Sequence, residues 1–179
     1  MRQSQTGFTL IELMIGVAIV TLLVGVAAPN LGRMAKTHRA NAALNALSAD
    51  LALARIAAIS RGKSITACPS RDAVSCVDDG DWSEGWLVFA DGNGDRRLDA
   101  GEHVLSTQQA SRVRGLQLRS TQGRPAIRYL PSGFSFGSNA TVSVCLDGRA
   151  FAALIVNNAG RVRVERAAGP MQPCAALQG

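Results

Sequence analysis

Two arginines near the C-terminus have the type and spacing that could bind phosphate. Residues 157–166 read Asn-Asn-Ala-Gly-Arg-Val-Arg-Val-Glu-Arg, a turn followed by an alternating strand. Because strand side chains alternate between faces, Val162 and Val164 are predicted to face the core. Arg161 and Arg163 then point together to solvent, about 6.5–7 Å apart, which matches the phosphate repeat of a nucleic-acid strand. The alternative is an exposed amphipathic strand whose charges solubilise the surface or pair with Glu165 or with acidic neighbours.

Charge is polarised along the chain. The formal net charge is +6, but residues 72–102 hold nine acids against two arginines, and residues 103–179 hold nine arginines against two acids. A basic surface of this kind favours anionic partners, although a solvated surface is the alternative. Four further arginines could widen a patch around Arg161 and Arg163: Arg149, Arg166, Arg112 and Arg114.

An acidic segment has part of the spacing of a calcium loop. Five residues take ligand positions 1, 3, 5, 9 and 12 of an EF-hand: Asp91, Asn93, Asp95, Asp99 and Glu102. Position 6, normally glycine, is Arg96, and the flanks read as strands. The alternative is an acidic turn whose side chains cap their own backbone and pair with Arg96 and Arg97. We expect no metal and no cofactor.

Glu12 is a lone carboxylate inside an apolar segment. The run from Phe8 to Ala28 holds 21 residues and no other charge, enough as a helix to cross a hydrocarbon core about 30 Å thick. A charge at the bilayer centre costs about 2.5–3.5 kcal/mol on insertion scales and usually has a partner. A secretory signal would have a shorter apolar region, and its candidate cleavage site at residues 26–28 is followed by Pro29. An ordinary anchor would have no reason to carry Glu12.

With its short polar leader, the segment from Gly7 to Pro29 resembles the class III signal of type IV prepilins and type II secretion pseudopilins. The resemblance implies that a prepilin peptidase cuts after Gly7 and that Phe8 becomes an N-methylated terminus. It also implies that Glu12 meets the terminal amine of a neighbouring subunit, which neutralises a charge that lipid cannot solvate. The expected location is the inner membrane, single-pass, with a periplasmic head that is incorporated into a pilus or pseudopilus.

An even number of cysteines in an exported domain predicts two disulfides. The four cysteines allow three pairings, of which the favoured one joins Cys68 to Cys76 in a short loop and Cys145 to Cys174 near the C-terminus. Zinc is the competing interpretation. No cysteine spacing is Cys-x-x-Cys, and the two histidines, His38 and His103, are remote in sequence, so metal ligation is disfavoured.

The elements that position these residues begin with one long helix. Pro29 removes a backbone donor, but an alanine- and leucine-rich stretch follows with apolar residues every three or four positions. Arg61-Gly62 is typical of a helix end. Two helices broken at Pro29 are the alternative. We expect a leader (1–7), a transmembrane or filament-core helix (8–28), an amphipathic helical spine (29–62) and a β-rich periplasmic head (63–179).

After Gly62 the pattern changes to short strands separated by glycine, proline and asparagine. Seven segments are expected as strands: 86–89, 104–105, 113–118, 127–130, 141–146, 151–156 and 161–165. The roughly 150 residues beyond the membrane segment are the size of one domain. The expected fold class is α+β and type IV pilin-like, a long N-terminal helix with an antiparallel β-sheet or small sandwich packed on it.

Residues 82–102, with Trp82-Ser83-Glu84-Gly85-Trp86 at their start, look like the signature of the GspH/FimT family. Its members are minor pilins and minor pseudopilins, which implies that the chain caps or primes a filament with other minor and major subunits. Gly160-Arg161-Val162-Arg163 also resembles the Gly-Arg-x-Arg element of DNA-binding FimT-type minor pilins, which helps a pilus capture DNA for natural transformation.

Two functions therefore follow from the resemblance. The favoured one is a FimT-like minor pilin that binds DNA nonspecifically and with strong salt dependence, through Gly160, Arg161, Arg163, Arg149 and Arg166. The alternative is an H-type minor pseudopilin of a type II secretion system with a purely structural role. Aromatic residues for base stacking are scarce, because most of the five Phe, two Trp and one Tyr are at predicted core positions.

Catalysis is not expected. The sequence has no nucleophile elbow, no phosphate-binding glycine loop and no pair of metal-ligand histidines. The cysteines are assigned to disulfides, and His38 and His103 have no obvious partners in the sequence.

Overall fold

A computed structural model describes residues 9–109, 114–167 and 174, with the side chains of residues 26–30 left out. The chain divides into two compact units, residues 1–38 and 39–179, so the second unit begins within the helix. Gly7 and Phe8, the expected cleavage and methylation positions, lie outside the described residues.

The helix α1 (Leu10–Arg61) is one continuous element of 52 residues, and its backbone stays helical through Pro29. The described apolar side chains of Leu10–Gly25 are exposed, Leu10 by 76%. Leu31–Arg61 is the stretch of described helix that is both long and apolar enough to cross a membrane, whereas Leu10–Gly25 is a shorter apolar stretch. In the longer stretch, however, Leu44, Leu47 and Leu51 are buried in the core of the head. Packing therefore assigns the part of that stretch beyond His38 to the head.

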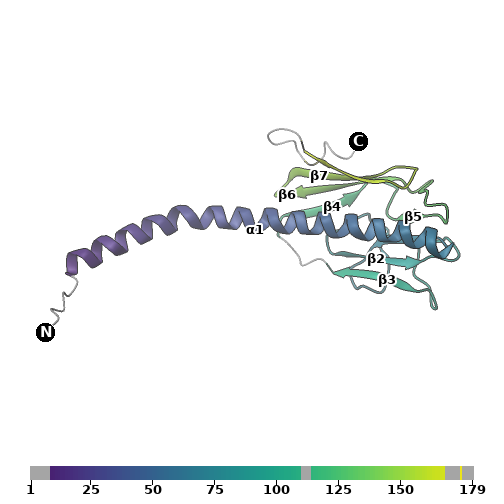
Figure 1. Ribbon diagram of the computed structural model, residues 1–179, viewed down its shortest axis with the longest axis horizontal. Coiled ribbons are helices and arrows are strands. Elements are labelled where there is room, and N and C mark those ends of the chain that lie inside the picture. Colours follow the sequence, from purple (N-terminus) through teal and green to yellow (C-terminus); the bar gives the residue numbers. More distant parts are fainter. Residues whose placement is uncertain (1–8, 110–113, 168–173, 175–179) are drawn as a thin grey trace, which may run out of the picture. The chain divides into compact units, whose positions relative to one another are not determined.

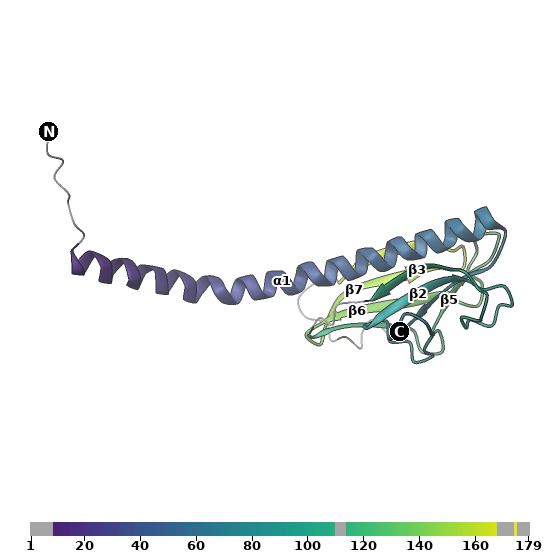
Figure 2. The same cartoon turned by 90° about the horizontal axis from the view of Figure 1, so that it is seen from below.

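The head (residues 39–179) carries two four-stranded antiparallel sheets under the helix (Figures 1 and 2). The first has the order β3-β2-β1-β5 and the second β4-β6-β7-β8. The strands are β1 (Ile65–Pro69), β2 (Gly85–Ala90), β3 (Val104–Gln109), β4 (Leu116–Ser120), β5 (Ile127–Tyr129), β6 (Ala140–Leu146), β7 (Arg149–Val156) and β8 (Val162–Arg166). The expected fold class is confirmed.

One hydrophobic core joins α1 to both sheets. Leu44 and Leu51 of the helix are buried together with Val88 of the first sheet and Leu154 of the second. Full burial of such a side chain contributes about 1.5–3 kcal/mol. A polar contact adds to this packing, because Asp50 accepts hydrogen bonds from the Trp86 indole nitrogen at 2.7 Å and from the Ser106 hydroxyl at 2.9 Å. The second half of α1 is therefore part of the head.

Two strands differ from the sequence-based expectation. β1 was not predicted, and all five of its residues are buried, so no apolar–polar alternation marks it. β4 covers Leu116–Ser120 rather than 113–118, and residue 113 lies outside the described part of the chain. The other expected strands coincide with β2, β3 and β5–β8 to within a few residues.

Candidate functional site

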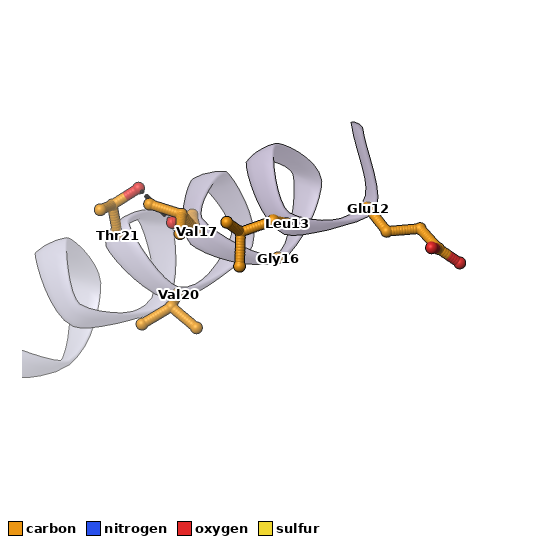
Figure 3. Close-up of a pocket in the computed structure, with 6 residues that line it drawn as sticks. All are labelled: Glu12, Leu13, Gly16, Val17, Val20 and Thr21. Carbon is orange, nitrogen blue, oxygen red and sulfur yellow. Dashed lines mark hydrogen bonds between the residues drawn. The ribbon is translucent and has the colours of Figure 1, made fainter. Parts of the chain in front are cut away.

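The first described turn of α1 forms a reciprocal cap. Thr9 precedes the helix, and its backbone nitrogen and hydroxyl both donate to a Glu12 carboxylate oxygen at 3.0 Å. The Glu12 backbone nitrogen donates back to the Thr9 hydroxyl at 3.4 Å. Figure 3 shows the Glu12 side chain pointing away from the apolar side chains of Leu13, Val17 and Val20. The Thr-x-x-Glu pattern is a readable capping-box signature that sequence reasoning missed.

Both disulfides have the pairing that the sequence favoured. Cys68–Cys76 has a Cα–Cα separation of 5.6 Å, and Cys145–Cys174 one of 5.9 Å. The first bond fastens the β1–β2 connection to the outer face of the first sheet, where Cys68 is buried with Leu87 and Phe89. The second ties residue 174 to β6. Both are structural, because they close loops onto sheets.

The acidic loop (residues 91–103) uses its side-chain oxygens on its own backbone. Asp91 is fully buried and accepts hydrogen bonds from the Thr66 hydroxyl at 2.6 Å and from two backbone nitrogens, those of Gly94 at 2.7 Å and Arg96 at 3.2 Å. Glu102 accepts from two more backbone nitrogens of the loop. Among the described residues no group of three or more metal-ligating side chains comes together. The geometry is that of a self-capped turn.

The turn that precedes β8 is fixed by backbone geometry. Gly160 has a φ of +71°, and an added Cβ would overlap the Gly133 carbonyl oxygen and approach the Tyr129 ring at 3.2 Å. The Arg161 backbone nitrogen donates to the Asn157 side chain at 2.9 Å, and the Gly160 nitrogen donates to the Asn157 carbonyl at 2.8 Å. Glycine is required here both by the backbone conformation and by the close neighbouring loop. It therefore positions Arg161.

Arg55 of α1 joins this turn to the neighbouring loop. Its Nε donates to the Gly133 carbonyl at 3.1 Å, and one terminal nitrogen donates to the Ala159 carbonyl at 3.0 Å. The two segments are also bonded directly, from the Ser135 nitrogen to the Asn158 carbonyl at 2.9 Å. We call residues 131–138 and 157–161 the distal loops, because they pack near the C-terminal end of α1.

The Tyr129 ring packs against the distal loops next to Gly160. Its side chain is fully buried, and its hydroxyl has no hydrogen-bond partner among the described residues. Burial raises the pKa of the Tyr129 phenol, against a smaller lowering by the Arg55 charge. The phenol therefore stays neutral and does not neutralise Arg55, whose charge adds positive potential next to the distal loops.

The predicted basic residues fall into separate places. Arg161 and Arg163 are exposed, and Arg163 forms an ion pair with Glu165 at 3.0 Å. Arg166 lies on the other face of β8, where it donates to the Asn41 side chain at 2.6 Å and covers the Phe151 ring at 5.4 Å. Arg149 begins β7, seven residues from the Val156 end and so about 23 Å from the turn.

Of the other two arginines proposed to widen the patch, the structure describes Arg114, which does not add to it. Arg114 lies in the turn before β4, next to Gly115, whose carbonyl accepts from the Asp147 nitrogen at the β6–β7 end of the sheet. Arg112 lies outside the described residues. The structure therefore brings Arg161 and Arg163 together at one end of the second sheet and places Arg114 and Arg149 at the other.

One prediction about side-chain exposure is wrong, that for Val164, and the prediction that most aromatic residues take core positions has two exceptions among the described residues. Val162 is half-buried against the core as expected, but Val164 is 39% exposed, because β8 is the edge strand and has a neighbour on one side only. Aromatic residues are not confined to the core either. Phe134 and Phe136 of the distal loops are 40% and 54% exposed. Their position in a loop between strands gave no periodic signal of burial or exposure.

The family comparisons agree with this fold. The model of the family described as type II transport protein GspH matches residues 43–160, and the prokaryotic N-terminal methylation motif matches residues 2–28. Pilin-like protein PilA1 of Thermus thermophilus is 27% identical over 168 residues, which cover 90% of this chain and 99% of that protein. Arg161 and Arg163 lie just beyond the end of the GspH match.

Two solved structures are similar in fold. The type IV minor pilin FimU of Pseudomonas aeruginosa superposes with a TM-score of 0.59 at 20% identity, covering 75% of this chain and 93% of that one. The minor pseudopilin EpsH of the Vibrio cholerae type 2 secretion system gives a TM-score of 0.52 at 18% identity, covering 73% and 99%. Because the GspH model matches more than half of the chain and the methylation motif precedes it, this chain belongs to the GspH/FimT-type family of minor pilins and pseudopilins.

Proposed function

We propose that the chain is a FimT-like minor pilin of a type IV pilus that binds DNA nonspecifically for uptake. One observation carries the proposal: Arg161 is exposed directly after a turn that Gly160 and Arg55 hold in place, with Arg163 two residues along the same edge strand. Because the turn fixes the backbone that carries Arg161, binding of a phosphate has to order the side chain but not the loop.

The ion pair between Arg163 and Glu165 does not prevent Arg163 from binding a phosphate. The two side chains are 68% and 56% exposed, and a surface pair of this kind contributes about 0–1 kcal/mol. A phosphate oxygen can therefore replace the carboxylate. Glu165 nevertheless keeps a negative charge near the incoming backbone, which lowers the affinity. No carboxylate of the described residues forms an ion pair with Arg161.

The other predicted site residues take supporting or separate roles in this proposal. Gly160 positions Arg161, and Arg166 is held by Asn41 and Phe151 on the core side of β8. Arg149 is too far along β7 to contact the same few phosphates. At the other end of the chain, a prepilin peptidase cuts after Gly7 in the inner membrane, and the N-methylated Phe8 begins the mature subunit with its head in the periplasm.

Glu12 is the proposed assembly residue. One oxygen of its carboxylate accepts two hydrogen bonds from Thr9 of the same chain, so before assembly the carboxylate has local donors that carry no charge. In a filament of other minor and major pilins, the terminal amine of a neighbouring subunit would join or replace Thr9. This contact supplies the positive charge that a hydroxyl and an amide cannot.

A second function has its own support. The family description and the fold of EpsH fit an H-type minor pseudopilin of a type II secretion system, whose role is structural. In that case the exposed arginines of β8 solubilise the head or contact neighbouring subunits. The two functions differ in one measurable property, the affinity of the head for DNA.

The test uses the full chain in detergent micelles and a fluorescent DNA duplex at low salt. Arg161→Gln/Arg163→Gln is compared with Arg96→Gln/Arg97→Gln, which removes the same charge from the acidic loop. We expect the first pair to weaken binding by about tenfold or more, since each charge-assisted phosphate contact contributes about 1–3 kcal/mol. The control pair should change the affinity by less than about twofold.

Each result separates the two functions. Equal loss in both double variants would mean that only the net charge matters and would remove Arg161 and Arg163 from the site. A wild-type chain that binds no DNA at low salt would contradict the proposal and leave the structural role in a secretion system.

A further inference from the structure

The distal loops carry an exposed aromatic pair beside the proposed phosphate-binding arginines. The rings of Phe134 and Phe136 stack with centroids 5.0 Å apart and planes within 5° of each other. They are 40% and 54% exposed, although large apolar side chains in a loop gain free energy by burial. Their core-facing neighbour Ser135 is fully buried, so the backbone alternation turns both rings outward.

The aromatic pair is held rigidly. Ser135 and Ser138 are both buried, their hydroxyls lie 3.1 Å apart, and the Ser138 hydroxyl donates to the Arg128 carbonyl at 2.9 Å. The Leu130 nitrogen donates to the Phe134 carbonyl at 2.8 Å, which closes the loop. Arg55 and the Ser135–Asn158 hydrogen bond then fix this loop to the turn that carries Arg161. The rings and the backbone that carries Arg161 therefore belong to one hydrogen-bonded unit.

The surroundings of the rings are basic. Residues 121–138 and 157–164 contain no aspartate or glutamate. The Ser135–Asn158 hydrogen bond places the turn that carries Arg161 next to the loop that carries the rings, and a hydrogen bond from its guanidinium to the Gly137 carbonyl places Arg124 at the same loop. Arg55 is half-buried beneath the loops and forms no ion pair with a described carboxylate. Exposed aromatic rings among cations are the composition of surfaces that bind single-stranded nucleic acid.

We propose that the distal loops bind single-stranded DNA in preference to duplex. Unpaired bases stack on the Phe134–Phe136 pair, and the phosphates on either side contact Arg161 and Arg124. In a duplex the bases are already stacked on each other and cannot reach the rings, so duplex binds through the arginines alone. This inference rests on the proposed DNA-binding function and adds to it the form of DNA that the site prefers.

The choice of DNA over a protein partner follows from charge. Residues 121–138 and 157–164 carry arginines and no carboxylate, so this surface has an uncompensated positive charge that an anionic ligand neutralises. Stacking is also tolerant of base identity, which suits the nonspecific binding proposed for Arg161 and Arg163. Contact with another pilin subunit is the alternative, and it predicts that removal of the rings leaves DNA binding unchanged.

The test measures the affinity of the full chain in detergent micelles for three fluorescent probes of about 16 nucleotides, long enough for one site. The probes are single-stranded thymidine DNA, an abasic strand with the same phosphates, and a duplex. The variant Phe134→Leu/Phe136→Leu keeps apolar volume but removes the π-faces, and Phe134→Tyr/Phe136→Tyr restores them. Thermal unfolding and non-reducing mass analysis check that the fold and disulfides are intact.

We expect wild type to bind thymidine DNA about tenfold more tightly than the abasic strand. The leucine variant should lose this difference and keep its duplex affinity within about twofold, and the tyrosine variant should recover it. Equal affinity of wild type for thymidine and abasic strands would overturn the inference while leaving the proposed function, provided that duplex binding still depends on Arg161 and Arg163.

Two further outcomes contradict the inference. Unchanged thymidine binding by a folded leucine variant would remove the rings from the DNA-binding site, as contact with another subunit predicts. Absence of binding to all three probes by wild type would overturn the proposed function together with this inference, and is therefore distinguishable from failure of the stacking contact alone.

Discussion

The acidic loop and the distal loops both follow strands of the head, yet they use their polar groups in opposite ways. In the acidic loop, Asp91 and Glu102 accept hydrogen bonds from the backbone nitrogens of the loop itself. In the distal loops, the structural bonds come from Arg55, Asn157 and two buried serines, which leaves Arg161 exposed. The carboxylates of the acidic loop are therefore engaged in hydrogen bonds within that loop, whereas the Arg161 guanidinium of the distal loops remains available to a ligand.

This difference shows why charge density in a sequence does not define a site. The segment 91–102 has the more suggestive spacing, with five oxygen ligands at EF-hand positions. Its carboxylates are nevertheless already hydrogen-bonded. The distal loops have a shorter motif, but an exposed guanidinium on a rigid backbone is available to a ligand. The predictions below test whether each loop depends on its own polar groups as described.

The largest expected effect is on stability, from Asp91→Ala. The substitution leaves the Thr66 hydroxyl and the Gly94 and Arg96 nitrogens without their acceptor in a buried site. We expect the free energy of unfolding to fall by about 3–5 kcal/mol, measured by urea denaturation. DNA affinity of the folded fraction should stay within about twofold of wild type.

Asp95→Ala is the matched control, because Asp95 is exposed and, within the described part of the chain, its side chain accepts one hydrogen bond, from the Arg97 nitrogen at 2.8 Å. Its expected cost is below about 1 kcal/mol. Similar losses for both variants would show that the buried hydrogen bonds of Asp91 are not what holds the loop.

Gly160→Ala should affect both stability and binding. The added Cβ overlaps the Gly133 carbonyl oxygen and forces alanine into a left-handed backbone conformation, so we expect a loss of about 2–4 kcal/mol. DNA affinity should fall by about fivefold, because the turn that directs Arg161 must move. Gly148→Ala, with a φ of +76° and open space around its Cβ, should cost about 1 kcal/mol and leave binding unchanged.

Arg55→Met removes both hydrogen bonds that join the distal loops to α1. We expect a loss of about 1–3 kcal/mol in the free energy of unfolding and a weakening of DNA binding by about threefold. Arg55→Lys keeps the charge but cannot reproduce both hydrogen bonds of the guanidinium. If lysine restores the affinity completely, the contribution of Arg55 is its charge, and the rigidity of the loops is not needed for binding.

Glu165→Gln has the smallest expected effect and the opposite sign. It frees Arg163 from its ion pair at 3.0 Å and removes a negative charge beside the strand. The affinity for DNA should rise by about twofold to threefold, measured by fluorescence anisotropy at low salt. A decrease would show that Glu165 orients Arg163 for phosphate rather than competing with it.

Much of the fold could be predicted because its signals are local. The apolar period from Leu31 to Ala58 and the Arg61-Gly62 end gave α1, and short loop closure gave the Cys68–Cys76 pair. β1 could not be predicted because it is buried on both faces and lacks alternation. A helix-forming stretch and an alternating strand carry their pattern within a few residues, whereas burial on two faces depends on distant segments.

The site was predicted less completely, for a reason that lies in the topology. Strand alternation in the sequence predicts that Arg161 and Arg163 share a face. The positions of Arg149, at the far end of β7, and of Arg166, in contact with Asn41, depend on the lengths and packing of β7 and β8. The exposure of Phe134 and Phe136 depends on Ser135 and Ser138 being buried beneath them. The hydrogen bonds between Thr9 and Glu12 are different, because the four-residue pattern Thr-x-x-Glu is enough to predict them.

The salt dependence of duplex binding tests the central claim most directly. Each phosphate contact that an arginine makes releases counterions and steepens the fall of the binding constant with salt by about 0.9 in a double-logarithmic plot. We predict that Arg161→Gln/Arg163→Gln reduces this slope by about 1–2 relative to wild type, while Arg96→Gln/Arg97→Gln leaves it unchanged. Equal slopes for wild type and the Arg161/Arg163 variant would contradict the assignment of these two arginines to phosphate contacts.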